Sequence, residues 1–154
     1  MFLILGYGNT LRNDDGVGRK VADAIEALQL PGVQALSCDL LTPELAAPLS
    51  RADLAVFVDA AVDAPTDVLL RPLEPSESSQ LMAHAADPRT MLALARDVFG
   101  HAPSAWWLTI PVANIGIGEE LSTVAQGGLV SAIQRILRLY ETSKRCLLLG
   151  VAVR

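Results

Sequence analysis

Three side chains of this sequence have the chemistry of a metal site, and each follows an apolar run of the chain. Asp15 lies in the glycine-rich segment GYGNTLRNDDGVG, Asp59 follows LAVFV, and His84 lies in QLMAHAADP. Carboxylate oxygens together with an imidazole nitrogen suit ions such as Ni²⁺ or Zn²⁺. Three ligands from three separate loops would leave open coordination positions. These three residues are therefore the candidate metal-contacting site.

Taken singly, each of these residues also has a structural interpretation. An acidic side chain at a helix start caps free N–H groups and contributes about 0.5–2 kcal/mol. Asn13 or Asp14 is sufficient for that cap, so Asp15 is not needed for it. Asp59 could accept hydrogen bonds from loop N–H groups, because an unpaired carboxylate on a buried strand is costly. A lone histidine such as His84 is usually structural.

The glycine-rich segment also has a nucleotide-binding interpretation. Gly6 and Gly8 fit a dinucleotide-binding loop, but Leu11 stands where that fingerprint requires its third glycine. Asp39, at the end of the second apolar run, could be the ribose-binding acid of such a site. A phosphate would meet the paired acids, however, and like charges about 4 Å apart repel by roughly 4 kcal/mol at an effective dielectric constant of about 20. The loop favours a cation.

Other catalytic patterns are absent from the sequence. It contains no Gly-x-Ser-x-Gly nucleophile elbow and no His-Glu-x-x-His zinc-protease motif. Cys38 and Cys146 are far apart, and we expect free thiols in a reducing cytoplasm. His101 and Asp63 are predicted to be exposed turn residues.

Five apolar runs are expected to form the strands that position the candidate site. Runs that are apolar on consecutive positions suit strands buried on both faces. The alternation of strands and helices predicts an α/β fold, a three-layer α/β/α sandwich with a mostly parallel, twisted sheet of about five strands. We expect one domain over residues 1–154. The five runs span residues 2–5, 33–37, 54–60, 67–73 and 105–111.

Ligands of such sheets bind beyond the carboxyl ends of the strands. We therefore expect Asp15, Asp59 and His84 to meet at that edge, with His84 following the fourth strand. Helical periods lie between the strands, with one apolar stripe ending at Leu28 and another at Val98.

The sequence indicates where some of the helices begin. Asp87 and Ser122 are the expected caps of the last two helices. The segment 146–154 is interpreted either as a further edge strand or as a loosely held end.

Composition excludes several classes of protein. The chain has 12 Lys and Arg against 17 Asp and Glu, a net charge of -5, and no block of like charges, which argues against nucleic acid or an anionic membrane as partner. No apolar run approaches the ~20 residues that span a bilayer. The start MFLILG lacks the basic region and cleavage site of a signal peptide. We expect a cytoplasmic monomer.

The assembled motifs resemble those of the NiFe-hydrogenase maturation proteases, the endopeptidases that trim the C-terminus of the hydrogenase large subunit. The similar segments are ILGYGNTLRNDDGVG, FVDAAVDA, HAADPRTMLALA and WWLTIPVANIGIGEELS, within residues 3 to about 140. Asp15 stands where the family commonly has Glu. The segment CDLLTPELA replaces the common Asp-Gly-Gly-Thr after the second strand, which suggests a subgroup with a different large-subunit partner.

The resemblance implies a phosphorylase/hydrolase-like fold and a peptidase that removes a short C-terminal extension from the nickel-loaded precursor. The nickel then belongs to the substrate, with no permanent cofactor, and is contacted by Asp15, Asp59 and His84. The metal or the carboxylates would polarise the scissile carbonyl and activate a water, with Asp15 or Asp59 as general base. The alternatives are a non-catalytic nickel-binding or chaperone module with the same ligands, and a small nucleotide-binding protein.

Overall fold

The five apolar runs all form strands. The computed structural model describes residues 1–63, 66–77 and 87–149. Each strand begins and ends within two residues of its predicted run, so the strand predictions are confirmed. The strands are β1 (Phe2–Tyr7), β2 (Val33–Cys38), β3 (Leu54–Ala61), β4 (Leu69–Leu73) and β5 (Ser104–Pro111).

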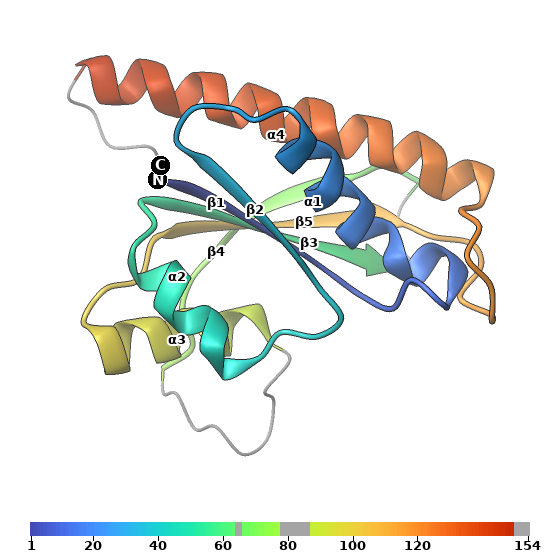
Figure 1. Cartoon of the computed structure of the whole chain (residues 1–154), viewed down its shortest axis with the longest axis horizontal. Helices are drawn as coiled ribbons and strands as arrows, with labels where there is room; N and C mark the ends of the chain where they lie inside the picture. The colour runs from blue at the N-terminus through green and yellow to red at the C-terminus, as the bar shows by residue number, and fades with distance from the viewer. Residues whose placement is uncertain (64–65, 78–86, 150–154) are drawn as a thin grey trace.

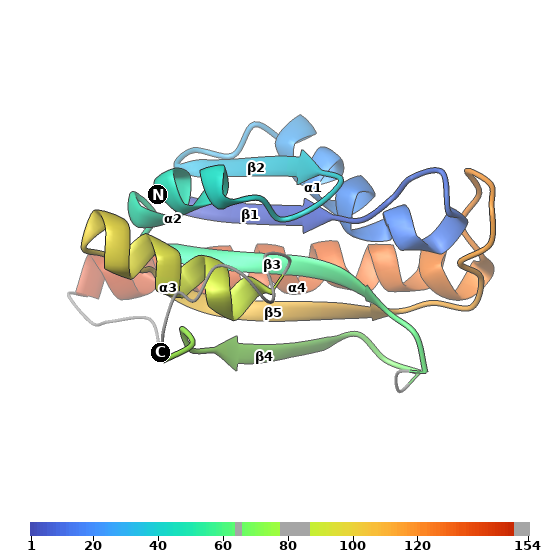
Figure 2. The same ribbon diagram turned by 90° about the horizontal axis from the view of Figure 1, so that it is seen from below.

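Across the described residues, the strands form a single sheet in the order β2-β1-β3-β5-β4. β2, β1, β3 and β5 run parallel to one another, whereas β4 runs antiparallel to β5. Figure 2 shows the reversed arrow of β4 at one edge of the sheet. The prediction of a mostly parallel sheet of about five strands is confirmed.

Helices cover both faces of the sheet. α1 and α4 pack on one face, and α2 and α3 pack on the other (Figure 1). The described helices are η1 (Asn13–Gly16), α1 (Val17–Ala27), η2 (Pro43–Leu45), α2 (Ala46–Ser50), α3 (Pro88–Phe99) and α4 (Thr123–Leu149), of which η1 and η2 are short 3-10 helices. This is the predicted three-layer sandwich.

Strand β1 connects the two cores. Its side chains alternate between the faces, as a strand requires. Phe2 and Ile4 join the core under α1 and α4, whereas Leu3, Leu5 and Tyr7 join the core under α2 and α3. All six residues of β1 are buried, which is why its sequence is apolar on consecutive positions.

The predicted helix caps at Asp87 and Ser122 are confirmed. The Asp87 carboxylate accepts a hydrogen bond of 3.1 Å from the backbone N–H of Arg89. The Ser122 hydroxyl accepts one of 3.2 Å from the N–H of Ala125. Both bonds satisfy N–H groups that a helix start leaves without an intrahelical acceptor.

Three predictions about helix ends are wrong. Leu28 and Val98 are exposed rather than buried, because each lies at the C-terminal end of its helix, beyond the buried stripe. The segment expected to be a strand or a loose end from position 146 begins as helix, since α4 continues through Cys146 to Leu149. Residues 150–154 lie outside the described residues.

Helix α1 packs so closely on the sheet that two glycines are required. A Cβ atom on Gly6 of β1 would lie 2.0 Å from the carbonyl oxygen of Gly18, and one on Gly18 would lie 2.3 Å from the carbonyl oxygen of Val58. In a dinucleotide-binding loop the third glycine permits this close helix–strand contact, and Leu11 stands at that position here. In this chain Gly18 permits the contact instead. The contact fixes the start of α1, and with it η1, directly beyond the carboxyl ends of β1 and β3.

Gly18→Ala is expected to destabilise the protein by about 1–3 kcal/mol, because the added methyl group overlaps the backbone of β3. Gly127→Ala is the matched control, since a Cβ there meets no atom within 4 Å. Alanine in an exposed helix interior stabilises by up to ~1 kcal/mol relative to glycine. Urea unfolding of both variants would contradict the packing argument if the two changes had the same sign.

Candidate functional site

The site lies at the point where the chain reverses its direction across the sheet. From β1 the chain passes through α1 on one face to β2, and from β2 through α2 on the other face to β3. β1 and β3 are neighbours, so their carboxyl ends flank the crevice at which α/β sheets bind ligands. Asp15 follows β1 and Asp59 lies near the end of β3.

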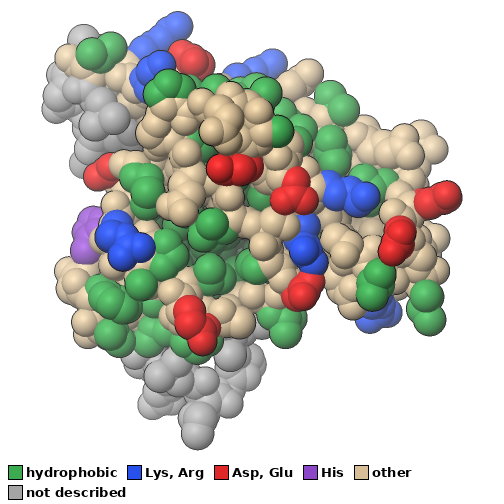
Figure 3. All heavy atoms as spheres, viewed as in Figure 1, with side chains coloured by type: hydrophobic (Ala, Val, Ile, Leu, Met, Phe, Trp, Pro, Cys, Tyr) green, Lys and Arg blue, Asp and Glu red, His purple; other side chains and the backbone are tan. Residues whose placement is uncertain are grey.

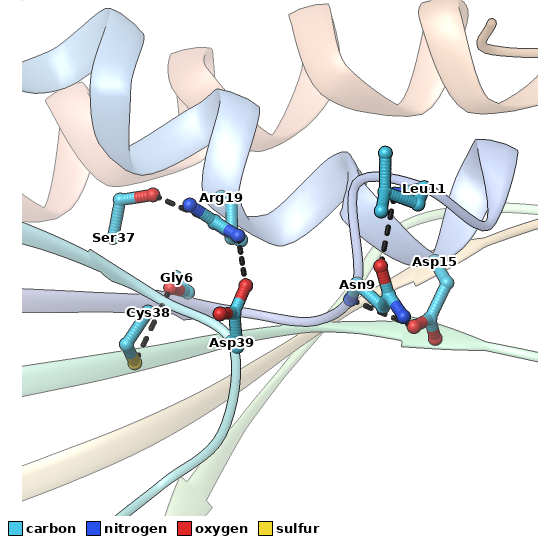
Figure 4. Close-up of polar contacts among 8 residues, drawn as sticks. All are labelled: Gly6, Asn9, Leu11, Asp15, Arg19, Ser37, Cys38 and Asp39. Carbon is cyan, nitrogen blue, oxygen red and sulfur yellow. Dashed lines mark hydrogen bonds and ion pairs between the residues drawn. The ribbon is translucent and has the colours of Figure 1, made fainter. Parts of the chain in front are cut away.

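Asp15 is held in η1 by a short local hydrogen bond. Its Oδ2 accepts a bond of 2.8 Å from the backbone N–H of Asn9, as Figure 4 shows. Gly8, one residue earlier, has φ +133°, and a Cβ there would lie 2.0 Å from the backbone oxygen of Asp15. The loop thus wraps tightly around this residue while the Asp15 side chain remains half-buried.

Asp59 lies in a drier environment on the neighbouring strand. The Tyr7 hydroxyl donates a hydrogen bond of 3.0 Å to its Oδ2. Burial raises the pKa of Asp59 to about 6, the bonds from Tyr7 and the backbone of Ala60 lower it, and the nearby charge of Asp15 raises it. The structure therefore places Asp15 and Asp59 within electrostatic range of each other at one edge of the sheet.

His84 lies outside the described residues. The reason for expecting it at this edge was wrong: β4 is antiparallel, and its last residue, Leu73, pairs with Ala105 near the start of β5, at the opposite edge. The chain is back at the site edge by Asp87, whose charge is among those that raise the pKa of Tyr7.

Asp14 has a role that the sequence interpretation missed. It was expected to cap its own helix, but η1 and α1 have no side-chain cap bond. Its fully buried carboxylate instead accepts bonds of 2.7–2.9 Å from the N–H groups of Ala113, Asn114 and Ser122 and from the Ser122 hydroxyl. Burial would raise the pKa of Asp14, but these bonds together hold it below its usual value.

Asn13 holds the same loop from the other side. Its side-chain amide donates to the carbonyl oxygen of Gly116 at 3.0 Å and accepts from the N–H of Glu120 at 3.1 Å. Asn13 has φ +47°, a left-handed conformation that asparagine tolerates. The loop 113–122 after β5 is thereby fixed against η1. The sequence signal was the polar pair next to Asp15, which has more hydrogen-bonding capacity than one helix cap uses.

Asp39 lies apart from Asp15 in Figure 4 and is paired with Arg19. Arg19 also donates through Nε to the Ser37 hydroxyl at 3.1 Å. The predicted position of Asp39 after β2 is confirmed, but its carboxylate is engaged by a guanidinium group. Cys38 beside it and Cys146 are free thiols, both half-buried.

The residues that could contact a metal are few in the described ranges. Within 1–63, 66–77 and 87–149, no three Asp, Glu, His or Cys side chains are grouped closely enough to hold an ion. Asp15 and Asp59 supply two carboxylates at the crevice, a partial coordination set.

The surface gives no sign of a continuous basic patch on the face seen in Figure 3, where acidic and basic side chains are interspersed. In the part of the chain that the structure describes, no helix is both long and apolar enough to cross a membrane.

Solved structures of similar fold include proteins with a common role. The hydrogenase maturating endopeptidase HybD from E. coli has a TM-score of 0.70 at 21% identity, covering 92% of this chain and 93% of the other. HybD from Thermococcus kodakarensis, a NiFe hydrogenase maturation protease, has 0.65 at 24%, covering 90% and 97%. The chain has the fold of the hydrogenase maturation endopeptidases. This agrees with the resemblance carried by the signature segments.

The match to this endopeptidase fold is a match of structures. A scan against protein-family models gives no match, and a search of curated protein sequences gives no significant one. At 21–24% identity, the superposition with the two HybD structures establishes how the chain is folded.

Asp59→Asn is expected to stabilise the fold above about pH 6 and to have little effect near pH 4. Because burial raises the pKa of Asp59 to about 6, the folded protein keeps a proton that the unfolded chain has released above about pH 4. Stability therefore falls as the pH rises through this window, by about 2–3 kcal/mol, and asparagine avoids that cost.

Urea unfolding at about pH 4 and about pH 8 measures this difference. Asp63→Asn is the control, since Asp63 is an exposed turn residue at φ +57° that asparagine can replace. A stability gain for Asp59→Asn that is equal at both pH values would refute the electrostatic origin.

Proposed function

We propose that this protein is an endopeptidase that removes a short C-terminal extension from the nickel-loaded precursor of a NiFe-hydrogenase large subunit. The observation that carries the proposal is the placement of Asp15 and Asp59. Both match carboxylates of the family signatures, and both lie at the crevice of a fold shared with structures named as hydrogenase maturation endopeptidases.

The nickel is part of the substrate in this proposal. The precursor presents the ion on its own cysteines, and Asp15, Asp59 and His84 contact it through its open positions. The two carboxylates at the crevice support this arrangement, since carboxylate oxygens are ligands for such an ion. The ion would polarise the scissile carbonyl or activate a water.

Asp59 is the better candidate for the general base. A base works best when its pKa lies near the operating pH, and burial raises the pKa of Asp59 to about 6. Asp15 has one oxygen engaged by the N–H of Asn9 and is less buried, which suits a carboxylate that contacts the incoming ion. The two acids would thus divide metal contact and proton transfer between them.

The loops around the site favour a protein substrate. Large apolar side chains are exposed on each loop that follows a parallel strand, and Ile117 is 97% exposed. Apolar groups gathered at one edge of a molecule are typical of protein-binding surfaces. The apolar rim consists of Leu11, Leu40, Val62, Ile115 and Ile117.

We also propose that the protein is a monomer and acts in the cytoplasm. The free, half-buried thiols of Cys38 and Cys146 suit a reducing compartment.

Cleavage of a purified nickel-loaded precursor tests the proposal. Asp15→Ala, Asp59→Ala and His84→Ala are each expected to lower kcat/KM at least about 100-fold, because each removes a group that contacts the ion or the reacting water. Asp63→Asn, on an exposed turn, and His101→Ala, an exposed residue between α3 and β5, are matched controls and should cleave at the wild-type rate.

Full processing by all three variants would exclude the assigned site. If the wild-type protein binds nickel tightly in calorimetry but cleaves nothing, the non-catalytic nickel-binding module is correct instead. Thermal stabilisation by a nucleotide but not by nickel would favour the nucleotide-binding alternative.

Ile117→Ser is expected to raise KM about tenfold with kcat unchanged, the loss of about 1.4 kcal/mol of docking energy. The loop is held rigidly by Asp14 and Asn13, so the exposed isoleucine meets a partner at little entropic cost. Val98→Ser, an equally apolar exposed position at the end of α3, should leave KM unchanged. Equal effects of the two substitutions on KM would contradict a role of the apolar rim in binding the substrate.

A further inference from the structure

Tyr7 and Asp59 form a part-buried, hydrogen-bonded pair at the centre of the site. Tyr7 is the last residue of β1, is 9% exposed, and lies on the face covered by α2 and α3. Asp59 is on the adjacent strand β3, and the Tyr7 hydroxyl donates to its Oδ2 at 3.0 Å. The bond joins neighbouring strands just where both reach the crevice.

The direction of this hydrogen bond is fixed by chemistry. A phenol has an ordinary pKa of about 10, so Tyr7 carries its single proton at neutral pH. Burial raises the pKa of Tyr7 most, and the negative charges of Asp59 and Asp87 disfavour a phenolate further. The one proton of Tyr7 is therefore given to Asp59, and Oδ2 is occupied as an acceptor.

Trp107 supports the pair from β5. Its indole Nε1–H is buried and has no hydrogen-bond partner among the described residues. The indole lies near enough to the Tyr7 hydroxyl to lower its pKa. An indole N–H only donates, so it does not compete for the tyrosine proton.

We propose that Tyr7 is a positioning residue for Asp59: its hydroxyl engages Oδ2 and, together with the backbone N–H of Ala60, holds the carboxylate in one orientation toward the substrate-borne ion or the attacking water. The inference rests on the proposed function. Two donors to one carboxylate restrict its rotation, so the lone pairs that remain approach the reacting atoms in one orientation. Loss of such a supporting bond lowers metal affinity or activity about 10–100-fold.

Tyr7→Phe tests the inference, because it keeps the ring in the core and removes only the hydroxyl. Tyr140→Phe is a matched control: its hydroxyl donates a bond of 2.9 Å to the carbonyl oxygen of Pro31, at the opposite end of β1. We expect kcat for precursor cleavage to fall about 10–100-fold in Tyr7→Phe, with KM changed less than about twofold. Tyr140→Phe should change neither quantity.

A spectroscopic measurement separates this inference from the proposed function. In protein labelled with ¹³C at aspartate, the Asp59 carboxyl resonance should move in Tyr7→Phe and stay in place in Tyr140→Phe, whether or not the precursor is cleaved. Should Tyr7→Phe fail to fold, the deuterium isotope shift of the wild-type Asp59 resonance in heavy water reports the same hydrogen bond.

Two results overturn the inference. One is an Asp59 resonance that neither moves in Tyr7→Phe nor has an isotope shift in the wild-type protein. The other is wild-type kcat in Tyr7→Phe, which would reduce the hydrogen bond to a structural contact. If the wild-type protein cleaves no precursor while the resonance moves as expected, the proposed function fails and the role of Tyr7 in preparing Asp59 for cleavage fails with it, although the hydrogen bond itself is established.

Discussion

The buried carboxylate of Asp14 connects the first loop of the chain with a loop about a hundred residues further on. It has four donors, from three residues of the loop after β5. Hydrogen bonds to a charged group contribute roughly 1.5–3 kcal/mol each, so the carboxylate is stabilised in spite of complete burial. The wall of the crevice, the start of α4 and the position of η1 all depend on this one anchor.

Neighbouring acids in this chain have different environments, and the difference divides their tasks. Asp14 is fully buried and saturated with donors, and its pKa is lowered. Asp59 is partly buried with fewer donors, and its pKa is raised to about 6. Among the described residues, Asp15 accepts a bond from one N–H group, and its side chain is half-buried. Environments that separate the pKa values of acidic side chains in this way are characteristic of sites in which one group must hold a proton and another must stay charged.

The apolar runs predicted the strands because a strand buried on both faces requires apolar residues on consecutive positions. They could not predict that β4 is antiparallel, since a strand at the edge of a sheet has a similar pattern in either direction. The expected position of His84 depended on where the fourth strand ends, and His84 itself lies outside the described residues. Position within a loop also predicted Asp15 and Asp59 at the crevice, because parallel strands bring their ends together.

Other features of the site have no local signal. Asp14 and Asp15 are identical residues side by side, and only the folded loop after β5 decides which of them is buried. The pairing of Tyr7 with Asp59 joins positions 52 apart, and nothing in either segment specifies the partner. The exposure of Leu28 and Val98 likewise has no local signal, because it depends on where α1 and α3 extend beyond the core that each helix covers.

The two outer strands of the sheet bear on how the molecule behaves at high concentration. An outer strand offers unpaired N–H and C=O groups to any other extended chain. β4 contains Pro72, which has no N–H to offer, next to the exposed Arg71. On β2, the N–H of Ala35 donates to the side chain of Glu26 at 2.9 Å. Proline and charge at one border and a carboxylate at the other make the sheet a poor template for growth, which protects a chain rich in apolar strands from aggregation.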